Sequence, residues 1–296
     1  MVDQVDLVNK IYEVIMSLDQ VVHGLFYLVA IFIIFFIGKI VYDKLNPRFK
    51  LKEELVDKDN FAVALTIIGY YLGLVFVIGG TLIGPSSGLV EDIIDIFYYG
   101  ILAIILLNIA GILVDKIILY KFDAVKEIID DQNAGTGVVE AANYIANGLI
   151  LYGAISGEGG DLVTAIIFWL LGQVVLVITC VFYNLITPFD VHEHIEKDNV
   201  AVGVAFAGML IALGNIIRIG LEGDFISWYQ NLSEFIGFVI FGIILLPLLR
   251  IATDKILLPG RKLTDELVNQ EKPNIGAGAI EAFTYIAASF IIGWIV

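Results

Sequence analysis

The sequence has 296 residues, of which 59% are hydrophobic and 17% charged, and its formal net charge is −15. Soluble globular proteins are usually about 45–50% apolar and about 25% charged, so this composition excludes an ordinary soluble domain and indicates a membrane protein. The excess of acidic over basic residues, 32 against 17, also argues against nucleic acid as a partner.

Eight apolar segments can each cross a bilayer, because a membrane-spanning helix needs roughly 20 mostly apolar residues. They lie near residues 24–42, 61–83, 96–114, 136–157, 162–186, 200–221, 235–253 and 276–296. The short alternating segments of a membrane β-barrel are not seen in the sequence. The sequence therefore predicts an all-α polytopic membrane protein with eight transmembrane helices.

Residues 1–23 precede the first apolar segment and repeat apolar side chains at helical spacing, with acidic side chains between them. This pattern predicts an N-terminal amphipathic helix that lies on the membrane surface. The alternative is that the segment extends the first transmembrane helix outward. It lacks the apolar stretch and the cleavage site of a signal peptide, so we do not expect it to be cleaved as one.

Basic residues indicate the orientation in the membrane. Of the 17 Lys and Arg residues, 15 lie in or beside the first, third, fifth and seventh loops, and the charged residues of the opposite loops are acidic. By the positive-inside rule the basic loops are cytoplasmic. We therefore expect both termini to be extracytoplasmic.

The chain is similar to itself at two levels. A shift of 139 residues places Asn60 on Asn199, and a shift of 141 places Glu140 on Glu281. These matches divide the chain after the N-terminal helix into two similar four-helix halves. The halves cover residues 24–157 and 158–296.

Each half divides again into two repeats of two helices, because a shift of 73 residues places Asn60 on Asn133. Each repeat has an even number of spans, so all four insert in the same orientation, in contrast to the inverted repeats of many transporters. The four parallel repeats could surround a central axis or pack as two pairs. The sequence leaves both arrangements open.

Two short motifs mark every repeat. The first span ends in Asp-Lys, except in the third repeat, where Asn184 replaces the aspartate. The second span begins with an asparagine that is followed by small residues two and four places later; these asparagines are Asn60, Asn133, Asn199 and Asn274. Asparagine is a favoured N-cap residue, so we expect each one to cap its helix. Alternatively, the four helix N-termini converge and attract anions.

Tandem two-helix repeats with these two motifs resemble the bacterial domain-of-unknown-function family 350, over about residues 24–296. The resemblance implies a multi-pass protein of the bacterial inner (plasma) membrane, surrounded by the lipid bilayer. It implies no assigned reaction and provides no catalytic or binding residues to transfer. It also implies the company of membrane-stress and envelope-resistance systems.

Glu140 and Glu281 are the candidate functional residues, because each lies about 10 Å into its predicted helix. The other two repeats carry Ile67 and Phe206 at this position. A carboxylate within the membrane is costly and normally faces protein or water. One hypothesis is that the two glutamates face each other and form a cation or proton site. The other is that each is protonated or paired with a base such as Arg250.

Further polar residues suggest structural roles. Lys39 with Asp43 and Arg250 with Asp254 stand four residues apart, which predicts ion pairs near the membrane interface. Hydrogen bonds between helices are the expected role of the polar side chains within the spans, which are Asn108, Asn143, Asn147, Gln173 and Asn215.

Nothing in the sequence indicates an enzyme, a cofactor or a metal site. The stretch from His192 to His194 has no further metal-ligand pattern, and no phosphate-binding loop or nucleophile elbow is present. The first functional hypothesis is a pathway or binding site for cations, protons or small solutes, lined by Glu140 and Glu281. The second is a structural or membrane-stress component that forms a homo-oligomer or scaffolds partners. A third is lipid or quinone binding.

Overall fold

The computed structural model describes the backbone of residues 2–83, 86, 88–258 and 260–296, and the side chains of these ranges from residue 20 onward. This described part is helical and contains no strand, as the sequence predicts. Eight of its helices are long and apolar enough to cross a membrane. They are Gln20–Leu45, Phe61–Leu82, Leu89–Ile118, Ala134–Ile155, Leu162–Ile186, Val200–Leu221, Trp228–Leu257 and Ile275–Ile295.

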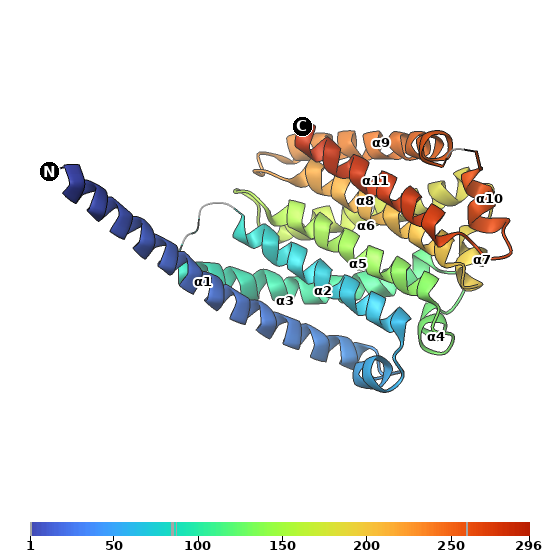
Figure 1. Ribbon diagram of the computed structural model, residues 1–296, viewed down its shortest axis with the longest axis horizontal. Helices are drawn as coiled ribbons and strands as arrows, with labels where there is room; N and C mark the ends of the chain where they lie inside the picture. Colours follow the sequence, from blue (N-terminus) through green and yellow to red (C-terminus); the bar gives the residue numbers. More distant parts are fainter. Residues whose placement is uncertain (1, 84–85, 87, 259) are drawn as a thin grey trace.

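The first helix is longer than its membrane span. Helix α1 runs without a break over Val2–Leu45. Figure 1 shows its N-terminal part extending beyond the rest of the molecule. The described residues up to 23 therefore continue the helix of the first span. The side chains of residues 1–19 lie outside the described part, so the placement of this segment on the membrane surface stays a prediction.

Each repeat is a helical hairpin with a short linker helix between its two spans. The first spans are α1, α3 (Leu89–Leu113), α6 (Leu162–Ile186) and α9 (Trp228–Ala252). The second spans are α2 (Phe61–Leu82), α5 (Ala134–Ile155), α8 (Val200–Leu221) and α11 (Ile275–Ile295). The linker helices are η1 (Glu53–Asp57), α4 (Ala124–Ile129), α7 (Val191–Glu196) and α10 (Leu263–Val268).

Three segments have π-helical hydrogen bonding. One is the linker helix η1, and the other two, η2 (Val114–Ile118) and η3 (Thr253–Leu257), end the first spans α3 and α9. All four linker helices lie at the same end of the molecule, which we call the linker side (Figure 1). Both chain termini lie at the opposite end.

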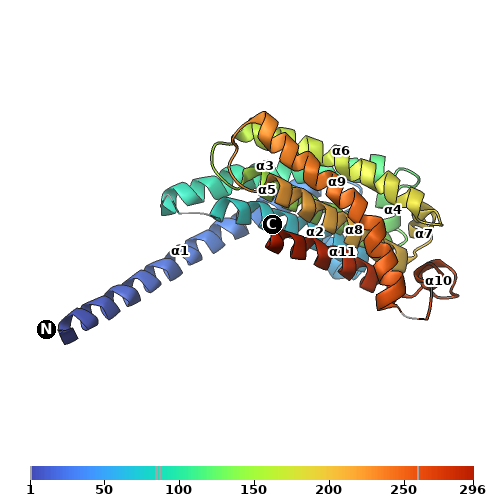
Figure 2. The ribbon, with the colours of Figure 1, turned by 90° about the horizontal axis from the view of Figure 1, so that it is seen from above.

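The second spans form a row in the order α2, α5, α8, α11, and each packs along the next (Figure 1). The first spans α3, α6 and α9 lie along one face of this row, as Figure 2 shows, and α1 packs mainly against α3. The contact between α5 and α8 joins the two halves as extensively as the contacts within each half. The repeats therefore form an open array, which neither surrounds a central axis nor separates into two pairs.

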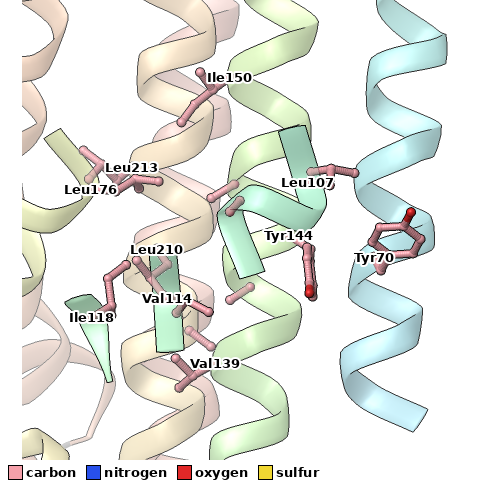
Figure 3. Packing of buried hydrophobic residues seen from close by; sticks show 14 of the residues in the cluster. Tyr70, Leu107, Val114, Ile118, Val139, Tyr144, Ile150, Leu176, Leu210 and Leu213 are labelled. Atoms are coloured by element: carbon pink, nitrogen blue, oxygen red, sulfur yellow. The ribbon is translucent and has the colours of Figure 1, made fainter. Parts of the chain in front are cut away.

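Buried apolar side chains fill the space between the two layers. Figure 3 shows Tyr70 of α2 and Tyr144 of α5 near Leu107 of α3, with Val139 and Leu210 between α5 and α8. Helix α8 is the most buried span, with 83% of its most apolar stretch buried, whereas the same share is 17% in α1 and α9. Spans at the margins of the array thus present apolar side chains outward, as expected in lipid.

An asparagine joins each repeat to the next one. Asn133 caps α5, because its Oδ1 accepts a hydrogen bond from the backbone N–H of Thr136 at 2.9 Å. Its Nδ2 donates to the carbonyl of Ile195, in the linker helix of the following repeat, at 2.7 Å. Asn60 and Asn199 make the equivalent two bonds, to their own helices and to the next linker helix. The N-termini of the second spans consequently lie in a row.

Backbone atoms of neighbouring second spans approach each other closely. A Cβ added at Gly69 would lie 2.2 Å from the Cα of Ala141. The small residues after the capping asparagines meet in the same manner at all three contacts, with Gly137 on Ala62, Gly203 on Gly135 and Gly278 on Ala201. Small residues of this kind allow tight helix packing where lipid provides no hydrophobic driving force.

The two ends of the row carry large side chains at these contact positions. Nine places after the capping asparagine the first three repeats have Gly or Ala, whereas α11 has Phe283, which is 62% exposed. Eight places after it the last three repeats have Ala, whereas α2 has Ile68, which is 53% exposed. A further helix could not approach either end as closely as the second spans approach one another.

The close contact between α2 and α5 predicts that a Gly→Ala substitution affects stability differently at two glycines of α2. Gly69→Ala should destabilise the protein by about 1–3 kcal/mol, because the added carbon overlaps the α5 backbone. Gly79→Ala is the control, since nothing lies within 4 Å of its added carbon, and it should be neutral or stabilising by about 0.5–1 kcal/mol. Thermal unfolding in detergent micelles measures both, and equal melting temperatures would contradict the packing.

The asparagine bonds predict a difference between the interior and the end of the array. Asn133→Ala removes a cap worth about 1 kcal/mol. It also removes the bonds to the Ile195 carbonyl and to the buried Glu127 carboxylate, and the loss of the Glu127 partner costs about 1–3 kcal/mol more. Asn274 caps α11 and donates to Glu266, but it is exposed and bonds to no further linker helix, so Asn274→Ala should lose only the cap and one exposed hydrogen bond. Similar losses of thermal stability in the two variants would argue against the joining role.

Candidate intramembrane carboxyl sites

Glu140 and Glu281 occupy equivalent positions on α5 and α11 but lie in different surroundings. Side chains from α1 and α3 surround Glu140, and side chains from α6 and α9 surround Glu281. No residue is common to the two sets. The two carboxyl groups therefore occupy separate sites and do not form one shared site.

Glu281 is completely buried and paired with Arg250. The Nη1 of Arg250 bonds with the Oε1 of Glu281. The hydroxyls of Tyr183 and Tyr285 donate to the same oxygen at 3.2 and 2.9 Å. The Arg250 guanidinium also lies 5.8 Å from the ring centre of Phe189. A buried carboxylate is tolerated when its charge is matched, so this site is a buried ion pair. The Oε2 of Glu281 and the Nη2 of Arg250 have no hydrogen-bond partner among the described residues.

The predicted ion pair between Arg250 and Asp254 is wrong, because Arg250 points into the bundle toward Glu281. An unmatched buried carboxylate costs far more free energy than an exposed interfacial pair contributes. Asp254 instead accepts a hydrogen bond from the backbone N–H of Leu263 at 2.6 Å. The other predicted pair is present: the Nζ of Lys39 lies 4.0 Å from the Oδ2 of Asp43.

Glu140 is 6% exposed, and its neighbour is a second carboxyl group, that of Asp115. Both carboxyl groups line one cavity. Neither takes part in an ion pair in the described part of the chain. Where the second half carries Arg250, the first half carries Gly111. The equivalent glutamates therefore have different neighbours.

The aspartate at the end of the first span has a structural role in the other repeats. Asp43, Asn184 and Asp254 each accept a hydrogen bond from a backbone N–H at or near the start of the following linker helix, at 3.2, 2.8 and 2.6 Å. Asp115 is the exception: its Oδ1 is buried and has no hydrogen-bond partner among the described residues. Because Asn184 serves equally well, this backbone contact does not require a negative charge.

A cavity of about 90 Å³ lies beside Glu140 at the linker side. It is enclosed by the ends of α1 and α3, by α4 and by α5, and its lining includes Tyr42, Gly111, Asp115, Glu140 and Tyr144. One water molecule requires roughly 10–15 Å³ on this measure, so several water molecules or a small cation would fit. The cavity therefore brings two carboxyl groups within reach of a small ligand.

The sequence predicts Glu140 as a site residue but does not predict the participation of Asp115 or Gly111. Asp115 belongs to a motif present in three of the four repeats, which favours a shared structural role and conceals its different contact. A signal for Gly111 was present: the shift of 139 residues places it on Arg250, so one half lacks the base that the other half has.

Three of the polar side chains predicted to join helices, Asn143, Asn147 and Gln173, belong to a network between α5 and α6. The Nε1 of Trp169 and the Nε2 of Gln173 donate to the Oδ1 of Asn147 at 2.7 and 2.6 Å. Asn147 donates in turn to the backbone carbonyl of Asn143 at 2.9 Å. These side chains use their hydrogen-bonding groups on one another between α5 and α6, so they hold the two helices together.

The stretch from His192 to His194 lies in α7. A ring nitrogen of His192 bonds with the carbonyl of Ile118 at 2.6 Å, and Glu193 pairs with Lys197. Within the described residues no three His, Cys, Asp or Glu side chains are grouped so that they could hold a metal ion. The stretch therefore has a structural role, because its side chains contact neighbouring segments at the linker side.

Eight apolar helices in four hairpins of one orientation define a multi-pass α-helical membrane protein built from two-helix repeats. The family model described as Domain of Unknown Function (DUF350) matches residues 16–155 and again residues 159–296, and the chain belongs to this family.

Two bacterial relatives are similar to this chain. The UPF0719 transmembrane protein of Aquifex aeolicus (strain VF5) is 23% identical over 270 residues, which cover 90% of this chain and 97% of the relative. The UPF0719 transmembrane protein YshE of Bacillus subtilis (strain 168) is 25% identical over 132 residues, which cover 45% of this chain and 92% of the relative. No solved structure matches the chain. The relatives support a multi-pass bacterial membrane protein.

The buried pair in the second half predicts strong coupling between its two members. Arg250→Met leaves the Glu281 carboxylate unmatched and should cost about 3–5 kcal/mol, because one charge then remains buried alone. Glu281→Gln leaves the guanidinium unmatched in the same way. The double variant should be far more stable than the sum of the two losses predicts, as measured by thermal unfolding in micelles. Additive losses would show that the pair is not coupled.

Proposed function

We propose that this protein binds a proton or a cation at the Glu140–Asp115 pair, at the cytoplasmic side of the bacterial inner membrane. The orientation rests on the basic residues, which concentrate in the loops of the linker side, so that side faces the cytoplasm and both termini face outward. The observation that carries the proposal is a cavity lined by two carboxyl groups, the buried Glu140 and the half-buried Asp115, neither of which forms an ion pair in the described structure.

The chemistry follows from the contact between the two acids. Two ionised carboxylates can only accept hydrogen bonds, so a direct bond between Glu140 and Asp115 would require one proton. Two like charges that line one small cavity also cannot both be present at low cost. A cation that enters the cavity removes that restriction and allows the proton to leave. The pair would thus bind a proton and a cation in competition.

Comparison with the second half indicates that Glu140, and not Glu281, carries the proposed function. Arg250 supplies a permanent positive charge to Glu281, so that carboxylate needs neither a proton nor an external cation. Only one of the two duplicated glutamates is therefore assigned to the proposed site.

Labelling with dicyclohexylcarbodiimide, which attacks protonated carboxyl groups in apolar surroundings, tests the proposal. We expect peptide mass spectrometry of the purified protein to find Glu140 labelled and Glu281 unlabelled. Added sodium, potassium or guanidinium salts should slow the labelling of Glu140 if they bind. An unlabelled Glu140, or equal labelling of both glutamates, would contradict the proposal.

A matched pair of variants separates the site from the fold. Asp115→Asn removes one carboxyl group from the pair, so added cations should no longer protect Glu140. Asp43→Asn is the same change at the equivalent position of the first repeat. It should behave as the wild type, because Asn184 makes the same backbone contact in the third repeat. Loss of protection in both variants would indicate a general structural effect.

A second candidate function is lipid or quinone binding. It is favoured by an apolar groove of about 510 Å³ between α9 and α11, lined by Gly237, Phe238, Phe241 and Ile292 among others.

The structural alternative is a homo-oligomer or scaffold. At the ends of the array another helix could not pack as closely as the second spans pack on one another, because Phe283 and Ile68 are exposed there.

A further inference from the structure

The cavity beside Glu140, here called the Glu140 pocket, has an equivalent site in the second half of the chain. That equivalent site contains the guanidinium group of Arg250. The repeat alignment places Tyr42 on Tyr183, Tyr144 on Tyr285 and Glu140 on Glu281. The tyrosines and the carboxyl group are thus common to both halves. What differs is the base: Arg250 reaches Glu281, and Gly111 stands at the corresponding place in the first half.

The contacts of Arg250 indicate what such a pocket recognises. Its guanidinium donates from Nη1 both to Glu281 and to the hydroxyl of Tyr183, the latter at 3.3 Å. Its central carbon lies 5.9 Å from the ring centre of Tyr183. A planar cation therefore uses a buried carboxylate and an aromatic ring together, which is a combination that suits guanidinium better than ammonium.

The Glu140 pocket retains these features and adds one. Tyr42 and Tyr144 line it together with Glu140, and Gly111 contributes no side chain. The Oδ1 of Asp115, which is buried without a hydrogen-bond partner among the described residues, supplies a further acceptor. A guanidinium group has several N–H donors in one plane, so it can bond with two neighbouring carboxyl groups at once.

We propose that the Glu140 pocket binds a guanidinium-type monovalent organic cation, in the place that Arg250 occupies in the second half. This inference rests on the proposed function and names its ligand class. The cavity of about 90 Å³ accommodates the planar head of such a cation, and it lies at the linker side, where a ligand enters without crossing the bilayer. Guanidinium is also more weakly hydrated than ammonium, so less hydration is lost on entry.

Protection of Glu140 from carbodiimide labelling provides the test, with the full-length protein in micelles. Guanidinium chloride at low concentration is compared with potassium chloride and tetramethylammonium chloride at equal ionic strength. At ten times its dissociation constant, guanidinium should slow the labelling about tenfold, because only about one molecule in eleven remains free. Neither of the other two cations should protect at that concentration.

A variant that supplies the ligand from within the chain sharpens the test. Gly111→Arg places an arginine where the second half has Arg250, so Glu140 should lose its labelling and the protein should lose its response to guanidinium. Gly111→Ala is the matched control without the charge and should still be labelled. Its added carbon would lie 2.4 Å from the hydroxyl of Tyr144, which has to shift in both variants. Gly111→Arg introduces a large side chain and could fail to fold. In that case the comparison of cations on the wild-type protein is the decisive test.

The outcomes separate the inference from the function on which it rests. Equal protection by potassium and guanidinium, or no protection by guanidinium while Glu140 is labelled, overturns the guanidinium assignment and leaves the carboxyl site standing. An unlabelled Glu140 in the wild type overturns both. Selective protection by guanidinium that Asp115→Asn abolishes and Asp43→Asn retains supports the assignment.

Discussion

Close backbone contact between successive second spans is the constraint on which the rest of the structure depends. Where Gly69 meets Ala141, the helices are too close for side chains to intervene. That distance brings the capping asparagine of one repeat within reach of the next linker helix, as Asn133 reaches Ile195. It also places the first spans on one face of the row. Each candidate carboxyl group then lies between its own helix and two first spans.

Much of this fold could be predicted from the sequence, because local rules determine it. Span length and helix caps depend on residues near each other in the chain, and repeat similarity is read directly by shifting the sequence along itself, so the eight helices and their tandem repeats follow from the sequence. The order of packing could not be predicted in this way. Whether parallel hairpins close into a ring or remain a row depends on which small residues face each other, and a single sequence does not contain that information.

The candidate site shows the same division between local and non-local information. The position of Glu140 along its helix follows from the distance to Asn133, but its partner Asp115 is brought to it by tertiary packing. The incorrect pairing of Arg250 with Asp254 has the same origin, because helical spacing ranks near neighbours first. Burial of Glu281 outweighs that preference, since the largest electrostatic cost in the second half is that of an unmatched interior charge.

The open row has a consequence for how anything could pass this molecule. A ring of parallel hairpins encloses a lumen that all its members share, whereas two layers laid side by side form a slab with broad faces and thin margins. A slab has no common axis, so a solute would have to move within a single hairpin pair or along a face in contact with lipid. Large apolar side chains such as Phe283 and Ile68 lie exposed at its margins. The described structure is therefore a two-layered slab and not a channel around a central axis.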